Sequence, residues 1–302
     1  MLSYGTRIGV MSPVLIDQRS HINYDTRNIQ DLENKKRSPS TILAYRADLE
    51  QLLKFLTEKN KVNPDQIVEV DIETFRDTLL TQKYTAKSVS RKLNAVKTFF
   101  RWLISEKYSN SNPTEFVSHP KIEAAMPKFL SPLEYRALRD VVRDDIRIAT
   151  IVEIVLQTGM RISEIANLKV EDLKEDSLIV EPHATQPQRT VPLNKPAKDA
   201  LDEYMNSRGN TNSSYVFISK NGKPLAIRNI RSAIDRYMQK AEIPQYSVND
   251  LRTTFIIENL KDEVDLVLLS QAAGHKRLST TERYLQLAQV KESGKKQTLA
   301  EL

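Results

Sequence analysis

Two arginines, a histidine and a tyrosine in this chain have the side-chain chemistry that attack on a phosphodiester requires. They are Arg161, Arg252, His275 and Tyr284, and offsets of 23 and 9 residues separate the last three. A guanidinium keeps its positive charge and forks onto two phosphate oxygens. An imidazole can donate to a third oxygen or move a proton, and a tyrosine hydroxyl can attack and carry the phosphoryl group covalently. The set therefore predicts phosphodiester cleavage through a covalent tyrosine intermediate.

Each of these four residues lies in a short run that would be unremarkable alone. The runs are Thr-Gly-Met-Arg-Ile-Ser-Glu at 158–164, Asn-Asp-Leu-Arg at 249–252, Gly-His at 274–275 and Thr-Glu-Arg-Tyr at 281–284. Because the runs occur together in this order, behind a basic helical segment, the chain resembles the tyrosine recombinases. These are site-specific DNA recombinases that include Xer proteins and phage integrases. The resemblance covers residues 38–290.

The resemblance implies a transesterification on double-stranded DNA. Tyr284 would attack the scissile phosphate and form a 3′-phosphotyrosyl bond, leaving a free 5′-hydroxyl, and a hydroxyl of a partner strand would then attack that bond. Arg161 and Arg252 would stabilise charge on the non-bridging oxygens, a role often given to a metal ion. The covalent bond conserves the energy, so the resemblance implies neither a cofactor nor a metal. It also implies a homotetramer acting on paired, specific recombination sites.

Three further residues are candidates for the catalytic set or its surroundings. Glu164 is expected to orient an arginine rather than to transfer a proton. Asn249 stands where the family usually has histidine or lysine, and an amide cannot shuttle protons near pH 7. The family also places a lysine, as general acid for the leaving 5′-hydroxyl, on a turn between two strands, and this chain has no lysine between Lys174 and Lys195. Either His183 in that turn supplies the proton, or another residue reaches in, or cleavage is slow.

The composition restricts the class of protein. The chain has 302 residues, of which 40% are hydrophobic, so it is long enough for about two domains with cores of their own. The absence of cysteine excludes disulfides, thiolate catalysis and cysteine-ligated zinc, and the four histidines are too scattered to suggest a metal site. No apolar run approaches the ~18 residues of a membrane span, and the first residues lack the features of a signal peptide. We therefore expect a cytoplasmic protein without a membrane segment.

The charge distribution favours nucleic acid as a partner. The net charge is +6, and residues 35–107 contain 15 Lys or Arg and 9 Asp or Glu, so this segment carries a charge equal to the whole chain's. Apolar residues at helical spacing predict helices over 38–57, 72–82 and 87–106. The third helix has five basic residues outside its apolar stripe, namely Lys87, Arg91, Lys92, Lys97 and Arg101. They form either an ordinary solvated face or phosphate contacts, and the resemblance favours DNA binding.

The chain is expected to have five parts. Residues 1–37 are polar and show no clear period, which indicates a flexible or peripheral N-terminal arm. Residues 38–107 form a helical bundle, which the resemblance identifies as the core-binding domain. Turn and breaker residues make 108–128 a linker, residues 129–290 form the catalytic domain, and residues 291–302 are a polar C-terminal tail.

The catalytic domain is predicted to contain helices and a small sheet. Ser131, Pro132 and Glu134 have the pattern of a helix start with a capping box. Further helices are expected near 147–157, 198–205 and 227–241, and strands at 178–180, 189–193 and 215–218. A capping box between Ser279 and Glu282 would place Tyr284 in the first turns of a helix. The fold class is therefore mainly α with a small β-sheet, in which an N-terminal helical core-binding domain precedes an α+β catalytic domain.

Three functions compete at this stage, besides a basic helical protein without phosphoryl chemistry. The first is an active recombinase of the Xer or transposon-resolvase kind. The second is an integrase of a phage or mobile element, against which the short N-terminal arm counts weakly. The third is a cleavage-impaired architectural DNA-binding factor, which Asn249 and the missing hairpin lysine would favour. Both arginines, His275 and Tyr284 count against the third.

Overall fold

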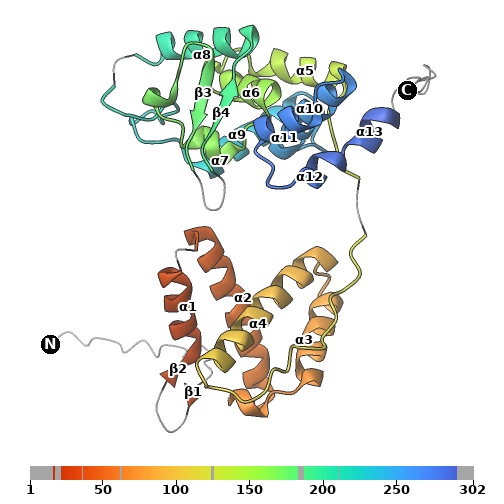
Figure 1. Ribbon diagram of the computed structural model, residues 1–302. Helices are drawn as coiled ribbons and strands as arrows, with labels where there is room; N and C mark the ends of the chain where they lie inside the picture. Colours follow the sequence, from red (N-terminus) through yellow and green to blue (C-terminus); the bar gives the residue numbers. More distant parts are fainter. Residues whose placement is uncertain are drawn as a thin grey trace, which may run out of the picture. The chain divides into compact units, whose positions relative to one another are not determined.

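The structure is a computed structural model that describes residues 16–17, 22–35, 37–61, 63–123, 126–182, 187–209 and 211–290. The chain divides into two compact units, residues 1–124 and 125–302 (Figure 1). The first unit is helical apart from one very short strand pair, and the second combines helices with a two-stranded sheet. This is the mainly α architecture with a small sheet that the sequence predicts.

The N-terminal unit is built on helices that begin at clear caps. Its elements are β1 Ile16–Asp17, β2 Ile22–Asn23, α1 Tyr24–Asn34, α2 Pro39–Glu58, η1 Pro64–Gln66, α3 Glu69–Thr81 and α4 Ala86–Ser105. The Ser38 hydroxyl accepts from the Thr41 amide at the start of α2, and Thr85 caps α4 in the same way. The three helices predicted from apolar spacing are therefore confirmed to within about three residues.

Helix α1 was not predicted, since residues 1–37 were expected to form an arm. The helix contacts α2 and α4, and its side chains Tyr24, Ile29 and Leu32 are buried. Residues 24–34 are therefore part of the helical unit. The sequence pattern was weak because only these few apolar residues interrupt an otherwise polar stretch. Such a helix is held mainly by tertiary packing rather than by its own propensity.

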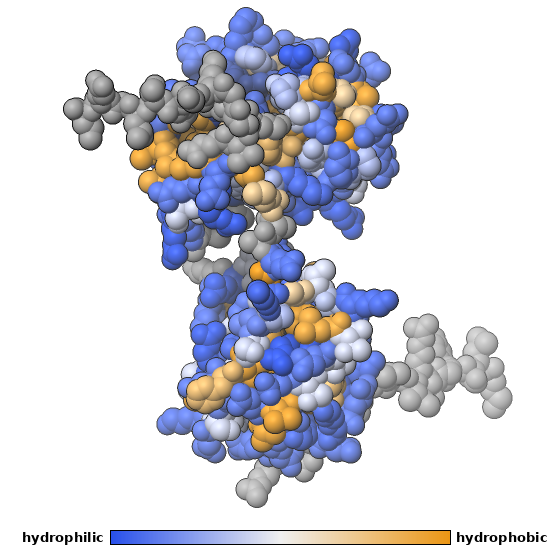
Figure 2. Space-filling model, turned by 90° about the vertical axis from the view of Figure 1, so that its right-hand side faces the viewer, coloured by the Kyte–Doolittle hydropathy of each residue, from blue (hydrophilic) through white to orange (hydrophobic). Residues whose placement is uncertain are grey.

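The core of this unit lies between α2, α3 and α4. Its fully buried side chains include Leu52, Phe75 and Phe100, one from each helix. Val117 from the following segment joins this core, and its carbonyl accepts a hydrogen bond of 2.8 Å from Lys97. Part of the expected linker thus packs on the helical unit. On the face shown in Figure 2, apolar side chains of this unit lie in small groups among hydrophilic ones.

The C-terminal unit contains a β-hairpin surrounded by helices. Its elements are α5 Pro132–Val142, α6 Ile146–Thr158, α7 Ile162–Ala166, η2 Val170–Asp172, β3 Ser177–Val180, β4 Arg189–Pro192, α8 Lys195–Ser207, α9 Ile227–Lys240, α10 Val248–Lys261, α11 Leu266–Ala273, α12 Ser279–Glu282 and α13 Leu285–Val290. Strands β3 and β4 pair antiparallel, with Leu178 opposite Val191. The Ser131 capping box, both strands of the hairpin and the helices near 147–157, 198–205 and 227–241 are confirmed.

Helix α6 is the centre of this unit. It is apolar on nearly all sides, and its neighbours α5, α8, α9 and α10 cover it (Figure 1). A helix that is hydrophobic all round can be stable only in the interior. The C-terminal end of α6 therefore has a fixed position, and the segment that carries Arg161 begins there. No helix in the described part of the chain is long and apolar enough to cross a bilayer.

Two local predictions for this unit are wrong. Tyr215 and Ile218 form isolated bridges, with Lys169 and Pro224, in place of a third strand. Helix α12 is capped by Leu278 without a side-chain hydrogen bond, so the expected capping box at its start does not form. The turn between α12 and α13 holds Tyr284, which therefore lies outside both helices.

Candidate active site

The two arginines of the predicted set meet at the C-terminal end of α6. Gly159 ends the helix with φ of 62°, a left-handed conformation that glycine adopts without strain. A Cβ atom there would also run into the ring of Phe255 on α10. The Arg252 guanidinium, one turn earlier on α10, donates a hydrogen bond to the Gly159 carbonyl. The glycine turn therefore places Arg161 at the start of α7, close to α10.

Arg161 links α7 to the turn that precedes His275. Its backbone N–H and its Nη1 each donate to the Glu164 carboxylate over 2.9 Å, and its Nη2 donates to the Gly274 carbonyl over 2.7 Å. These bonds hold the guanidinium in one orientation. One third of the side chain remains exposed, so it can still reach an anion.

Arg252 is largely removed from water, and this alters its electrostatics. Burial, followed by repulsion from Arg161, lowers the pKa of Arg252 to about 10, although attraction to Glu164 opposes the shift. The guanidinium is still charged near neutral pH. Two positive groups held this close, and poorly hydrated, favour binding of an anion between them.

His275 and Tyr284 lie next to each other beside these arginines. The two rings stack with their centroids 6.5 Å apart and their planes at 12°, and His275 Nδ1 is 2.8 Å from the hydroxyl of buried Thr281. Burial, then repulsion from Arg252 and Arg161, lowers the pKa of His275 to about 4. The imidazole is therefore neutral at pH 7. Arg252 also interacts electrostatically with Tyr284, so the phenol belongs to the same group of side chains as this guanidinium.

A third guanidinium, which the sequence did not single out, completes the site. Arg189 on β4 donates to both oxygens of Glu164, over 2.9 and 2.7 Å, and to the Ala272 carbonyl over 3.1 Å. Burial raises the pKa of Glu164, but the bonds from Arg189 and from the Arg161 amide outweigh it, so this pKa lies below its usual range. Glu164 is thus an ionised carboxylate that holds both Arg161 and Arg189 in place. In the sequence, Arg189 stood out only as the first residue of a predicted strand. A strand pattern does not indicate a partner 25 residues away.

The glycine before His275 fits this arrangement. Gly274 ends α11 with φ of 65°, and a Cβ atom there would lie 2.7 Å from Cζ of Arg189. A side chain at this position would therefore push against the guanidinium that holds Glu164. The Gly-His pair singled out in the sequence thus has a steric reason as well as a chemical one.

Two predicted residues are less closely connected to this group. Asn249 lies three residues before Arg252, one turn away on the same side of α10, and its side chain is exposed. The hairpin candidate His183 lies outside the described residues. The part of the chain that the structure describes contains no group of three or more histidine, aspartate or glutamate side chains placed to hold a metal ion.

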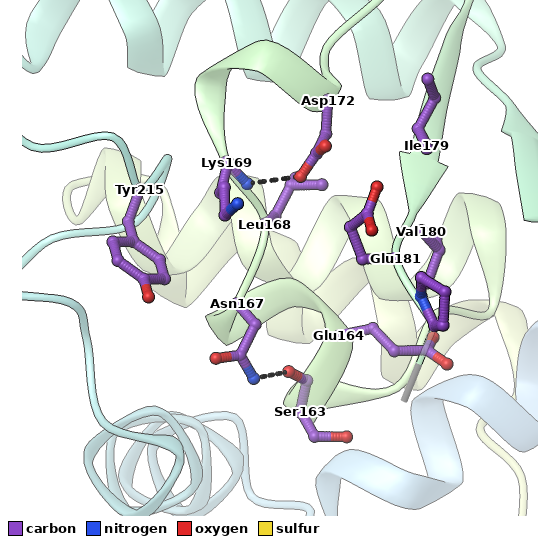
Figure 3. Close-up of a pocket in the computed structure, with 11 residues that line it drawn as sticks. Ser163, Glu164, Asn167, Leu168, Lys169, Asp172, Ile179, Val180, Glu181 and Tyr215 are labelled. Atoms are coloured by element: carbon purple, nitrogen blue, oxygen red, sulfur yellow. Dashed lines mark hydrogen bonds between the residues drawn. The ribbon is translucent and has the colours of Figure 1, made fainter. Parts of the chain in front are cut away.

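A neighbouring cavity of about 340 Å³ borders the site without containing it. Figure 3 shows Glu164 on one wall and Glu181 and Asp172 on others, with Lys169 and Tyr215 nearby. Its lining includes neither Arg161 nor Arg252, and neither His275 nor Tyr284. This cavity therefore lies on the hairpin side of Glu164, away from the four converging groups.

The basic residues of α4 differ in what they present to solvent. Lys92 is only 8% exposed, and its Nζ donates to buried Asp48 over 2.9 Å, so its ammonium is already paired. The expectation that it lies outside the apolar stripe is wrong, and we leave it out of any DNA interface. Arg91 also pairs with Asp48 through both Nη atoms but stays about half exposed.

The remaining three residues of that set have no acidic partner among the described residues. Lys97 is bound to the Val117 carbonyl, as described above, and Arg101 Nε donates back to the Lys97 carbonyl over 3.2 Å. Lys87, near the start of α4, is exposed. Lys87 and Arg101 therefore offer the most accessible positive charge on this helix.

Comparisons with known proteins agree with this geometry. Residues 128–290 match the Phage integrase family, and residues 28–107 match the Phage integrase, N-terminal SAM-like domain. Tyrosine recombinase XerC of Listeria monocytogenes serotype 4b (strain F2365) is 29% identical over 261 residues, which cover 82% of this chain and 87% of that protein.

Solved structures are similar over most of the chain. The crystal structure of XerA recombinase has 26% identity and a TM-score of 0.53, covering 92% of this chain and 98% of that one. A lambda integrase tetramer bound to a Holliday junction has 17% identity and a TM-score of 0.69, covering 84% and 76%, and it supports the fold alone. The chain therefore belongs to the phage integrase family and is a site-specific tyrosine recombinase of the Xer type.

Proposed function

We propose that Tyr284 is the nucleophile with which this recombinase cleaves DNA. Its hydroxyl attacks the scissile phosphate, forms a 3′-phosphotyrosyl bond and releases a 5′-hydroxyl. The observation that carries the proposal is the convergence of both arginines, His275 and Tyr284 from four separate segments within one chain.

Arg161 and Arg252 are proposed to hold the non-bridging oxygens of that phosphate. Burial and repulsion from Arg161 destabilise the charged form of Arg252 in the free protein, although it stays charged near neutral pH, and a bound phosphate would offset both effects. Charge that develops in the transition state would meet donors that are already oriented, Arg161 by Glu164 and Arg252 by the Gly159 carbonyl. Loss of one such donor typically costs about 2.7 to 4 kcal/mol of transition-state stabilisation.

His275 is proposed to assist the tyrosine. A phenol has a pKa of ~10, so Tyr284 must lose its proton to attack efficiently. The neutral imidazole stacked beside it can accept a proton or donate a hydrogen bond, and the positive charge of Arg252 interacts with the tyrosine. Asn249, exposed on the same side of α10 as Arg252, is proposed to contact the DNA by hydrogen bonding alone.

The assembly and its location are proposed from the substrate. We infer that four copies act on two paired DNA sites, as in the lambda integrase tetramer on a Holliday junction, and that the protein works in the cytoplasm, where DNA is accessible.

Lys87, Arg91, Lys97 and Arg101 would contact phosphates and position the helical unit without reading sequence. Similarity to XerC proteins supports an Xer-like reaction over phage integration. The retained catalytic geometry is evidence against the cleavage-impaired alternative.

Covalent trapping tests the proposal directly. The substrate is a pool of duplexes with random sequence, in which each molecule carries one nick and the position of the nick differs between molecules. The pool is incubated with the protein, and covalent complexes are isolated on a denaturing gel. We expect a complex that resists denaturant, yields one consensus sequence and disappears in Tyr284→Phe. The matched control is Tyr135→Phe, which should leave trapping intact. Specific binding without any covalent product would refute the proposal.

A further inference from the structure

A cavity of about 600 Å³ lies beside His275 on the side of the β-hairpin. Its walls are residues 187–190 at the start of β4, Gln271 on α11, and Gly274, His275 and Lys276 after that helix. Strand β4 and helix α11 are in contact and lie side by side in Figure 1. Tyr284, which stacks on His275, is not part of the cavity wall. The cavity therefore borders His275 at a part of the residue that the tyrosine does not line.

This placement matters because phosphoryl transfer is an in-line displacement. The attacking and leaving oxygens lie roughly opposite each other across phosphorus. With Tyr284 as the attacking group, the leaving 5′-oxygen departs away from the tyrosine, and the cavity beside His275 offers a space that the tyrosine does not line. An alkoxide is a poor leaving group, so a proton donor is needed on that side.

Few groups around the cavity can supply this proton. Arg189 is held by Glu164 and Ala272, and a guanidinium does not give up its proton in proteins. His275 is neutral at pH 7 and lies beside the attacking tyrosine. Lys276 is exposed, and no described side chain pairs with its ammonium. Among the described residues that line this cavity, it is the one lysine.

We propose that Lys276 is the general acid for the leaving 5′-oxygen, a role that rests on the proposed function of Tyr284. As the bond from Tyr284 Oη to phosphorus forms and the bond from phosphorus to the 5′-oxygen breaks, Lys276 Nζ gives a proton to that oxygen. The neutral amine then takes a proton from the 5′-hydroxyl that attacks during strand joining. Each cycle therefore leaves the lysine in its starting state.

A sulfur substitution tests this role. In a DNA substrate whose bridging 5′-oxygen is replaced by sulfur, the leaving thiolate needs no proton. We expect Lys276→Ala to slow cleavage of ordinary DNA by about 10² to 10⁴ and to cleave the sulfur substrate at nearly the wild-type rate. The control is Arg277→Ala, which removes a neighbouring exposed charge and should affect both substrates equally.

The other outcomes contradict the proposal. Equal slowing of both substrates by Lys276→Ala would assign the lysine to binding, and a wild-type rate in Lys276→Arg would assign it to charge alone. Rescue by sulfur in His183→Ala but not in Lys276→Ala would transfer the role to His183. Failure of the wild-type protein to form a covalent complex on either substrate would instead refute the function proposed for Tyr284.

Discussion

Removing Arg189 should destabilise the catalytic unit by much more than an ordinary surface arginine would. The Glu164 side chain is 5% exposed and Arg189 is 12% exposed, so the Arg189→Met variant leaves a buried carboxylate with Arg161 as its remaining partner. Breaking a buried pair costs about 3 to 5 kcal/mol, and the retained Arg161 bonds favour the lower end. About 3 kcal/mol corresponds to a fall in Tm of roughly 6 to 12 °C for a domain of this size.

The pH dependence of this loss follows from the pKa of Glu164. In the native protein this pKa lies below its unfolded value, so its stabilisation is complete above the unfolded pKa and is lost as pH falls through the native one. Without Arg189, burial raises the pKa, and protonation then removes the cost of the buried charge. The difference in unfolding free energy between wild type and variant should therefore be largest near pH 7 and shrink as pH falls through the raised pKa of Glu164 in the variant.

The chain provides an internal control for this measurement. The single tryptophan, Trp102, lies in the helical unit, so its fluorescence follows that unit, while calorimetry follows both. We expect the Trp102 transition to stay unchanged in Arg189→Met. Arg143→Met, which breaks an exposed pair with Asp140, should cost less than about 0.5 kcal/mol. A loss below about 1 kcal/mol in Arg189→Met, or no recovery when Glu164→Gln is added, would refute the reasoning.

Three further predictions follow from the same contacts. Gly274→Ala should lower the unfolding free energy by about 1 to 2 kcal/mol and slow covalent trapping, because it combines a strained φ with a clash at Arg189; unchanged melting and trapping would contradict this. The pKa of His275 is about 4 in the folded protein and near 6.5 in the unfolded chain, so between these values the unfolded state binds the proton and the folded state does not. The unfolding free energy should therefore rise as pH increases from about 4 to 6.5. His275→Asn should remove this rise, as a series of denaturation curves would show. Asp48→Asn should cost about 3 kcal/mol, seen by Trp102 fluorescence, because it leaves the buried Lys92 ammonium without its anion; a shift confined to the catalytic unit would contradict this.

Local patterns in the sequence predict most of the elements that position the site. The helix ending at Thr158 is apolar and stops at a glycine, and the cap at Ser131 has its full capping box. The two strands of the hairpin are short segments separated by a run of turn residues. These features depend on neighbours within a few residues, so periodicity and cap chemistry are sufficient to predict them.

Local patterns also misjudged several residues, and in each case tertiary contacts decided the outcome. Lys92 is buried because Asp48, 44 residues earlier, neutralises it. Helix α1 was missed because its stability comes from contacts with α2 and α4. The start of α12 looked like a capping box, but the chain leaving Gly274 places Tyr284 in a turn beside His275.

The sequence by itself determined which chemistry this protein can perform, because side-chain types and their order are written in it directly. It therefore specified two guanidiniums, an imidazole and a phenol, and the helices that carry them. Only the tertiary structure decided that Arg189 holds Glu164 and that Lys276 lines a cavity together with His275. Contacts between separate segments arise when the core around α6 packs, and no local pattern encodes that packing.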